Sequence, residues 1–221
     1  MSGRLNVFVL RHGEPEDRTI FYGQKDVGLS PRGRSQVDAQ ADFFAERSLG
    51  AIVSSDLSRC TIGAEAIAAR CGLAVRTSSA LREMHLGVLE GVPIAEAVAS
   101  MPELAKRSYA DMLDFAFPEG GESVRTLSAR VMPEVERCIR ASDPNAGALL
   151  LYVHNTVARV VLAHAAGSGP EGYVRFEQRY AAVNRIEVDH AAKDLWARSA
   201  IHFANRPPVA AAPDGRARSR G

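Results

Sequence analysis

Residues 6–14 read NVFVLRHGE, an apolar run that ends abruptly in a guanidinium, an imidazole and a glycine. β-Branched and aromatic residues dominate the run, which is typical of a short buried strand. In open α/β sheets, ligands bind at the carboxyl ends of the strands. The pattern therefore places His12 where catalytic groups are found, although a strand that simply ends in a polar surface turn has the same pattern.

The same pattern recurs in two other parts of the chain. Residues 149–156 read LLLYVHNT and end their apolar run in His154, and residues 51–59 read AIVSSDLSR and end theirs in serines, with Arg59 just inside the next helix. Three strands thus bring two imidazoles and two guanidiniums, including that of Arg11, toward one edge of a sheet. This convergence indicates a functional site.

Strands alternate with helices along the chain, which implies a mostly parallel central sheet flanked by helices on both faces, an α/β three-layer sandwich. Apolar periodicity and capping residues predict the remaining elements. We predict helices at about 31–47, 58–70, 124–139 and 155–166, a further strand at 73–77, and a terminal hairpin of strands 185–188 and 195–201.

Two segments fall outside this alternation. Residues 92–118 have the pattern of helical pieces broken at Pro102, and we expect them to form a helical cap over the site. Residues 205–221 are rich in Pro, Ala, Arg and Gly, which is typical of a disordered tail. A single domain would then span residues 1–204, a length that can bury a sizeable core.

The composition is that of an ordinary soluble protein, with 221 residues, 46% hydrophobic and 24% charged. A net charge of +1 argues against a protein that binds nucleic acid or a membrane surface as its main partner. The cysteines Cys60, Cys71 and Cys138 are too few and too unpatterned for a disulfide framework or a zinc site. The first residues lack a signal-peptide pattern, and no apolar stretch approaches about 20 residues, so we expect the protein to be located in the cytoplasm.

The sequence carries no motif for a metal or cofactor: no dinucleotide fingerprint, phosphate-loop lysine, His-Glu-x-x-His pair, aspartate cluster or Gly-x-Ser-x-Gly elbow. We therefore expect neither metal nor cofactor. The polar groups of the predicted site are cationic, which suits a phosphate dianion. Arginine binds phosphate oxygens in a bidentate fork, and a neutral imidazole is a competent nucleophile toward phosphorus.

The chain resembles the histidine phosphatase (phosphoglycerate-mutase-like) superfamily through motifs that occur in the family's order over residues 5–190. Any one of these motifs is weak evidence, but the ordered set is specific. The motifs are LRHGE at 10–14, YGQKD at 22–26 with LSPRG at 29–33, SSDLSR at 54–59, LRE at 81–83 with Gly87 and LEG at 89–91, PEGGES at 118–123, and VH at 153–154.

The resemblance implies catalytic roles for five residues. His12 would be the nucleophile that becomes phosphohistidine. Arg11, Arg59 and His154 would hold the phosphoryl oxygens, and Glu83 would donate a proton to the leaving alcohol. These roles fit the chemistry, because fixed cations stabilise the charge that a loose phosphoryl-transfer transition state spreads over its oxygens.

Four further residues are candidates for substrate binding. Gly23 and Gln24 lie in a loop that leaves the first strand at the predicted site. Asn155 stands where family members commonly carry Gly, and either its backbone amide or its side chain would contact phosphate. Glu122 contacts substrate according to the resemblance, or else provides a favourable charge at the start of the helix that follows Ser123.

We predict a metal-independent phosphomonoester hydrolase of the histidine acid phosphatase type. It would act through phosphohistidine on a small phosphorylated metabolite. The YGQKD loop looks somewhat like that of α-ribazole phosphatases, which makes α-ribazole phosphate one candidate. The sequence leaves the oligomeric state open, with a homodimer among the possibilities.

Two alternatives remain open. A phosphoglycerate-type mutase is disfavoured by residues 15–18, where such mutases resemble one another in carrying Trp and Asn. Only about 35 residues separate Glu83 from the later Gly-Glu-Ser turn, so the insertion typical of those mutases is absent. The other alternative is a catalytically silent binder of phosphorylated ligands, of which Asn155 would be the sign.

Overall fold

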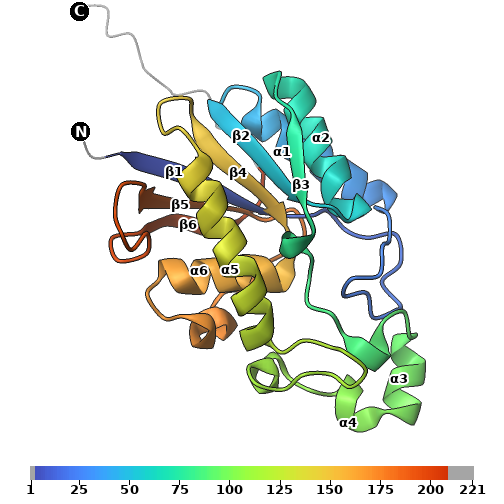
Figure 1. Cartoon of the computed structure of the whole chain (residues 1–221). Helices are drawn as coiled ribbons and strands as arrows, with labels where there is room; N and C mark the ends of the chain where they lie inside the picture. The colour runs from blue at the N-terminus through green and yellow to red at the C-terminus, as the bar shows by residue number, and fades with distance from the viewer. Residues whose placement is uncertain (1–2, 209–221) are drawn as a thin grey trace, which may run out of the picture.

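The computed structural model describes residues 3–208, and these form a six-stranded sheet that joins segments far apart in the sequence (Figure 1). The strand order is β3-β2-β4-β1-β5-β6. The first four strands in this order are mutually parallel, and the last two are antiparallel to their neighbours. The strands are β1 (Arg4–Arg11), β2 (Leu49–Ser55), β3 (Val75–Ser78), β4 (Ala148–Val153), β5 (Val183–Asp189) and β6 (Ala200–Arg206).

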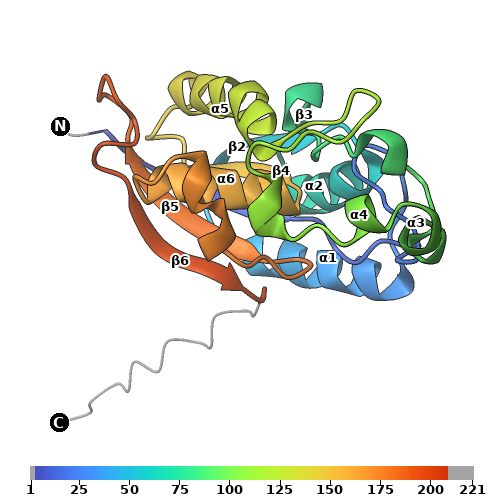
Figure 2. The same cartoon turned by 90° about the horizontal axis from the view of Figure 1, so that it is seen from below.

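Helices cover both faces of this sheet (Figure 2). Successive side chains of a strand point to opposite faces, so β1 contributes to two cores. Val7 and Val9 pack in one cluster with residues of α5 and α6, whereas Phe8 and Leu10 pack in the other with residues of α1 and α2. The predicted three-layer α/β sandwich is confirmed. The four helices are α1 (Pro31–Phe44), α2 (Ser58–Cys71), α5 (Val124–Ala141) and α6 (Asn155–Ala165).

The helix boundaries follow the local chemistry that predicted them. The Ser30 hydroxyl accepts a hydrogen bond from the Gly33 N–H at the start of α1, and Gly72 ends α2 with a φ of 66°. Ser123 caps α5, and the apolar series expected inside that helix is fully buried. Helical periodicity was therefore sufficient to orient α5.

The segment predicted to be a cap lies beyond the carboxyl ends of the parallel strands (Figure 1). It contains α3 (Ile94–Ser100), α4 (Pro102–Ala105) and the 3₁₀ helix η3 (Tyr109–Met112). Backbone hydrogen bonds tie its start to the loop after β1: the Ile94 N–H donates to the Thr19 carbonyl at 2.7 Å, and the Phe21 N–H donates to the Val92 carbonyl at 2.9 Å. The remaining short 3₁₀ helices are η1 (Ser79–Leu81), η2 (Gly87–Leu89) and η4 (Pro170–Arg175).

The terminal hairpin exists, but its second strand was wrongly placed. The predicted strand 195–201 is mostly turn, and β6 runs from Ala200 to Arg206 instead. The apolar residues Leu195 and Trp196, which suggested the strand, pack instead in the cluster that contains α5 and α6. β6 includes Asn205, where the tail was expected to begin, and the predicted tail from residue 209 onward lies outside the described residues.

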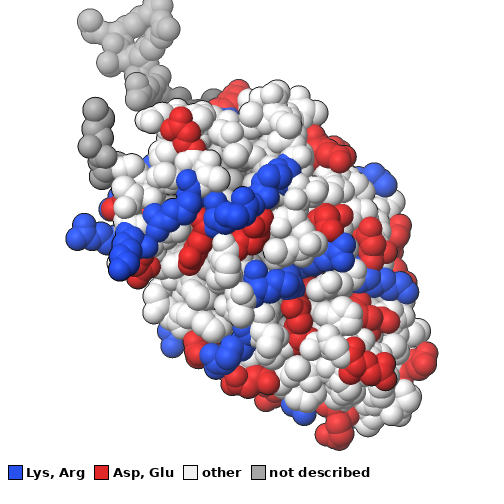
Figure 3. Space-filling view, viewed as in Figure 1, with Lys and Arg blue, Asp and Glu red and all other residues white. Residues whose placement is uncertain are grey.

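Charges of both signs mix over the face that carries α5 (Figure 3). Glu134 on α5, for example, accepts hydrogen bonds from both Arg76 and Arg137. Such pairing leaves no large single-sign field on this face. It agrees with the net charge of +1.

Candidate active site

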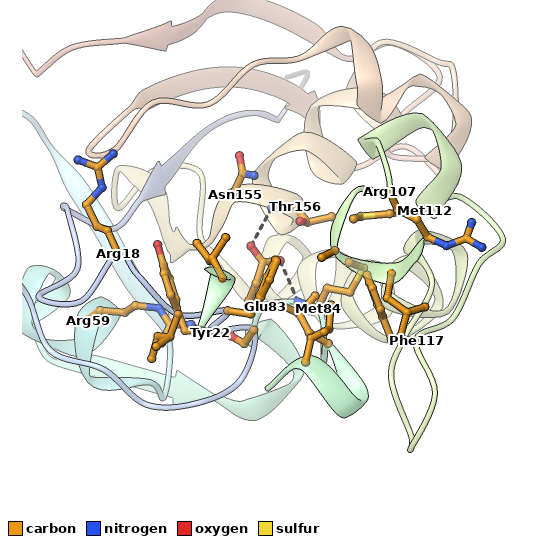
Figure 4. Close-up of a pocket in the computed structure, with 18 of the residues that line it drawn as sticks. Arg18, Tyr22, Arg59, Glu83, Met84, Arg107, Met112, Phe117, Asn155 and Thr156 are labelled. Atoms are coloured by element: carbon orange, nitrogen blue, oxygen red, sulfur yellow. Dashed lines mark hydrogen bonds between the residues drawn. The ribbon is translucent and has the colours of Figure 1, made fainter. Parts of the chain in front are cut away.

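A cavity of about 400 Å³ opens at the carboxyl edge of the sheet, beneath the cap. Its lining comes from the loop after β1, the start of α2, the segment around Glu83, the cap, the start of α6 and the residue Tyr180 before β5. Figure 4 shows Glu83 near the centre of this lining, with Arg59 on one side and Met112 on the other. Four of the five predicted catalytic residues line the cavity: Arg11, His12, Arg59 and Glu83.

His12 follows the last residue of β1 and is almost completely buried. Its Nδ1 lies 2.7 Å from the Gly13 carbonyl oxygen, which can only accept a hydrogen bond, so Nδ1 carries the proton and Nε2 keeps its lone pair. Burial, reinforced by the charges of Arg11 and Arg59, lowers the pKa of His12 well below 6.5. At neutral pH, His12 is therefore an uncharged imidazole with a free nucleophilic nitrogen.

His154 lies beside His12 because β1 and β4 are neighbours in parallel register. Arg11 pairs with Val153, so the residues that follow the two strands are adjacent, and their imidazole rings are 5.2 Å apart. The His154 Nε2 lies 2.9 Å from the Ser55 hydroxyl at the end of β2. Burial also lowers the pKa of His154 well below 6.5. The predicted echo of strand followed by histidine thus produces one imidazole pair.

The two guanidiniums are held by backbone carbonyls rather than by carboxylates. Arg11 donates to the Gln178 carbonyl at 2.5 Å. Arg59, which is fully buried, donates to the carbonyls of Lys25 at 2.9 Å and Gly23 at 2.7 Å. These contacts orient both cations without neutralising them.

Each of these guanidiniums also keeps one buried N–H unused. The Nε atoms of Arg11 and Arg59 have no hydrogen-bond partner among residues 3–208. A buried polar group without a partner is costly, and a buried cation without a counter-charge more so. A phosphate dianion in the cavity supplies both the acceptors and the charge.

Glu83 is held in place by backbone N–H donors on both sides (Figure 4). Its Oε1 accepts from the Met84 N–H at 2.8 Å and its Oε2 from the Thr156 N–H at 3.0 Å. The segment before it is fixed by Arg130, which donates to the carbonyls of Ala80, Arg82 and Glu83. The carboxyl group is thereby fixed within the cavity, where it can deliver a proton to a leaving group.

Gly23 and Gln24 join the phosphate side of the cavity to the acid-bearing segment. Gly23 lines the cavity, and a Cβ at that position would overlap the Met84 carbonyl oxygen and the Glu90 carboxylate. Gln24, predicted to bind substrate, does not line the cavity, and its side chain donates to the Glu83 carbonyl at 3.1 Å. The Glu90 carboxylate accepts three backbone N–H groups, those of Gln24, Lys25 and Leu86, at 2.8 to 2.9 Å.

Asn155 lines the cavity as the first residue of α6, and its side-chain oxygen accepts from the Arg159 Nε at 3.2 Å. Glu122 does not reach the cavity. Its carboxylate accepts two hydrogen bonds from Arg130 at 2.7 Å and one from the His85 N–H at 3.0 Å. Glu122 therefore supports the segment that carries Glu83, and the expected substrate contact is not present.

Tyr22 and Tyr180 line the cavity but were not predicted as site residues. Tyr22 directly precedes Gly23 in the loop after β1, and the sequence pattern predicted no role for it. Tyr180 could have been found from topology: β5 runs antiparallel to β1, and Leu10 pairs with Val183, so residues just before β5 lie at the same edge as the end of β1. An antiparallel strand contributes the residues that precede it, not those that follow it, to a site at this edge of the sheet.

Residues 3–208 contain no cluster of three His, Cys, Asp or Glu side chains arranged to hold a metal ion. In the same part of the chain, none of the helices has the length and apolar character needed to span a bilayer.

Comparison with known proteins places this geometry in a family. The model of the histidine phosphatase superfamily (branch 1) matches residues 7–198, which include every predicted site residue. The chain belongs to this superfamily. The resemblance stated from the motifs is confirmed, and the observed fold is that of its histidine phosphatase relatives.

Relatives within the histidine phosphatase superfamily carry several names. Phosphoglycerate mutase-like protein 4 of Arabidopsis thaliana is 35% identical over 72% of this chain and 70% of its own length. The probable phosphoglycerate mutase GpmB of Yersinia enterocolitica is 31% identical over 85% of this chain and 86% of its own.

Two solved structures of similar fold are phosphatases by name. A mycobacterial glucosyl-3-phosphoglycerate phosphatase is 26% identical with a TM-score of 0.78, covering 91% of this chain and 99% of the other. A putative α-ribazole-5′-P phosphatase of Escherichia coli has a TM-score of 0.79 at 18% identity, with coverage of 94% and 99%, and this likeness is one of fold.

Proposed function

We propose that this protein is a metal-independent phosphomonoester hydrolase that forms a phosphohistidine on His12 and acts on a small phosphorylated metabolite. One observation carries the proposal. A neutral imidazole with a free Nε2 and a carboxyl group line one cavity with two guanidiniums whose buried Nε atoms have no partner among residues 3–208. This set supports nucleophilic attack, charge stabilisation and proton transfer at one phosphorus atom.

The first half-reaction transfers the phosphoryl group to the enzyme. The His12 Nε2 lone pair attacks phosphorus, and the ester P–O bond breaks with its electron pair on the leaving oxygen. The protonated Glu83 carboxyl gives its proton to that oxygen, so a neutral alcohol leaves. The positive charge that develops on the imidazole is stabilised by the hydrogen bond from Nδ1 to the Gly13 carbonyl.

The second half-reaction hydrolyses the phosphohistidine. Water attacks phosphorus while the Glu83 carboxylate accepts its proton, and the N–P bond breaks with its electron pair returning to Nε2. Arg11 and Arg59 compensate the charge on the equatorial oxygens in both steps. Phosphate then leaves, and the neutral histidine and the protonated acid are restored.

The test is hydrolysis of p-nitrophenyl phosphate in EDTA, together with acid-quench detection of labile phosphate on the protein. We expect turnover and a labile phosphoenzyme in the wild type and neither in His12→Ala. His202→Ala is the matched control, because His202 lies on β6 and pairs with Glu187 away from the cavity. Turnover that persists in His12→Ala contradicts the assigned nucleophile.

A phosphoglycerate-type mutase is the second candidate, and the names of the relatives that are 31% and 35% identical favour it. Incubation with 3-phosphoglycerate and a bisphosphate primer distinguishes the two activities. Isomer that forms faster than free phosphate identifies a mutase. Phosphate binding without any turnover identifies a silent binder, in which Asn155 replaces the family's usual Gly.

A further inference from the structure

The cavity is chemically two-sided, and its second side has no role in phosphoryl transfer. Charged groups gather where Arg11, His12 and Arg59 meet. On the far side of Glu83 from Arg59, Figure 4 shows Met112 and Phe117. Apolar side chains line much of the cavity, among them Met84, Leu86, Ile94, Leu104, Met112 and Phe117.

The position of Glu83 determines which part of a substrate meets this apolar wall. The acid protonates the leaving oxygen, so the group attached to that oxygen extends beyond Glu83. The direction away from Arg59 leads to Met84, Met112 and Phe117 (Figure 4). The wall therefore contacts the leaving group rather than the phosphate.

Among the described lining residues, Arg107 is the cation on this side. Its guanidinium lies 3.5 Å from the centre of the Phe115 ring and is directed away from Glu83 (Figure 4), and its buried Nε has no hydrogen-bond partner among residues 3–208. Arg18 lies on the phosphate side and pairs with Glu14 at 3.3 Å. A second anionic group on the leaving alcohol would face methyl and aromatic groups.

The wall also leaves apolar surface that a ligand can cover. Ile94 on α3 is 39% exposed although it lines the cavity, and Leu104 and Met112 are partly exposed. Removing such surface from water stabilises a complex in proportion to the apolar area buried. A cavity of about 400 Å³ has the size of a small-molecule site, larger than a phosphate group alone requires.

We propose that the substrate is a phosphomonoester of an uncharged, apolar alcohol, whose aliphatic or aryl group packs on the wall formed by the cap and the segment after Glu83. This inference rests on the proposed hydrolase function. It separates the protein from relatives whose names refer to phosphoglycerate or its glucosyl derivative.

The test is a series of ethyl, butyl and hexyl phosphate, with 3-phosphoglycerate alongside. The three alcohols are almost equally acidic, so only apolar contact changes along the series. We expect kcat/KM to rise about two- to fourfold per added methylene until the wall is covered. Hexyl phosphate should be hydrolysed faster than 3-phosphoglycerate at equal concentration. A flat series, or a preference for 3-phosphoglycerate, overturns the inference.

Substitutions connect this slope to the wall. Ile94→Gln and Met112→Gln should reduce the gain per methylene, because each places an amide where the chain packs. Val98→Gln is the matched control: Val98 lies on the same helix at 41% exposure but does not line the cavity, so the slope should stay at the wild-type value. Equal slopes in all three variants contradict the assigned wall.

Labile phosphoenzyme, measured in the same quench, separates two kinds of failure. If it forms from these esters while the slope is flat, the inference fails and the hydrolase mechanism stands. If no ester and no p-nitrophenyl phosphate labels the protein, the proposed function fails, and the inference fails with it.

Discussion

The hydroxyl oxygens of Tyr22 and Tyr180 lie 2.7 Å apart, although 158 residues separate the two tyrosines in the sequence. Each ring faces one of the two guanidiniums that line the cavity. The Arg11 guanidinium lies 4.1 Å from the centre of the Tyr180 ring, and that of Arg59 lies 5.4 Å from the centre of the Tyr22 ring. Burial and the Tyr180 hydroxyl raise the pKa of Tyr22 above its usual 10.0, so the Tyr22 hydroxyl stays protonated at neutral pH. The two hydrogen-bonded rings form a wall beside the two cations.

Tyr180→Leu should weaken inhibition by inorganic phosphate about fivefold, because the loss of a cation–π contact of about 1 kcal/mol frees the Arg11 guanidinium. Tyr180→Phe keeps the ring and should change the inhibition constant less than Tyr180→Leu does. The inhibition constants of both variants, measured at pH 7, decide between ring and hydroxyl. Equal losses in both variants would show that the Tyr22 hydrogen bond, not the ring, positions Arg11.

Glu83→Gln should lower hydrolysis of alkyl phosphates by about 10²- to 10⁴-fold, since the leaving alkoxide then lacks its proton donor. p-Nitrophenyl phosphate should lose less, because p-nitrophenolate leaves without protonation. The measurement is the rate of phosphoenzyme formation from both esters, with thermal unfolding as the control for folding. Equal loss with both esters contradicts the role of Glu83 as the acid.

The free energy of unfolding should fall as the pH drops below about 6.5. Burial holds the pKa values of His12 and His154 well below 6.5 in the folded protein, so between those values and 6.5 the unfolded chain binds protons that the folded protein does not. Stability therefore rises with pH across that window and is unaffected by these groups above it, with a slope of up to about 1.4 kcal/mol per pH unit for each histidine.

Urea unfolding at pH 7.5, 6.5 and 5.5 measures this slope. Below pH 6.5, His12→Asn should reduce the slope of the unfolding free energy against pH by up to about 1.4 kcal/mol per pH unit, the contribution of one proton. His202→Ala, which alters an exposed histidine on β6 away from the cavity, is the control. Identical slopes in wild type and His12→Asn would mean that His12 is protonated in the folded state.

Gly23→Ala should destabilise the protein by about 1–3 kcal/mol, the usual cost of overpacking. The added methyl overlaps the Met84 carbonyl oxygen, which is backbone and cannot rotate away. Gly3→Ala is the control, because a Cβ there meets nothing closer than 3.9 Å. Urea midpoints compare the two variants. A Gly23→Ala protein as stable as Gly3→Ala would show that the loop can shift without cost.

The strand-end residues could be predicted from the sequence because two simple regularities place them. An apolar run fixes the strand, and parallel strands end at a common edge, so Arg11, His12 and His154 were bound to meet. Glu83 lies on no regular element, and only its resemblance to a family motif singled it out. The motif indicates a catalytic role for Glu83 even though the local secondary structure cannot be predicted.

The positions of Tyr180, Glu122 and β6 depend on tertiary contacts that the hydrophobic periodicity of the sequence does not predict. Tyr180 reaches the site because β5 reverses direction beside β1, which local sequence does not specify. Glu122 was expected either at the substrate or as a favourable charge at the start of the helix after Ser123. In the structure its carboxylate accepts hydrogen bonds from Arg130, two turns further along the chain. The shift of β6 has a similar cause, since Leu195 is buried in the core cluster rather than paired in the sheet.

Glu90 couples the loop after β1 to the segment that carries Glu83. Its carboxylate binds the N–H groups of Gln24 and Lys25 on the loop whose carbonyls orient Arg59, and that of Leu86 on the segment that carries the acid. Displacing either segment disturbs the other, so substitutions on the two sides should be non-additive, with coupling energies of about 0.5–3 kcal/mol. Redesign of this protein for another ester must therefore change the loop of Gln24 and Lys25 together with the segment from Glu83 to Leu86, because a change in one displaces the other.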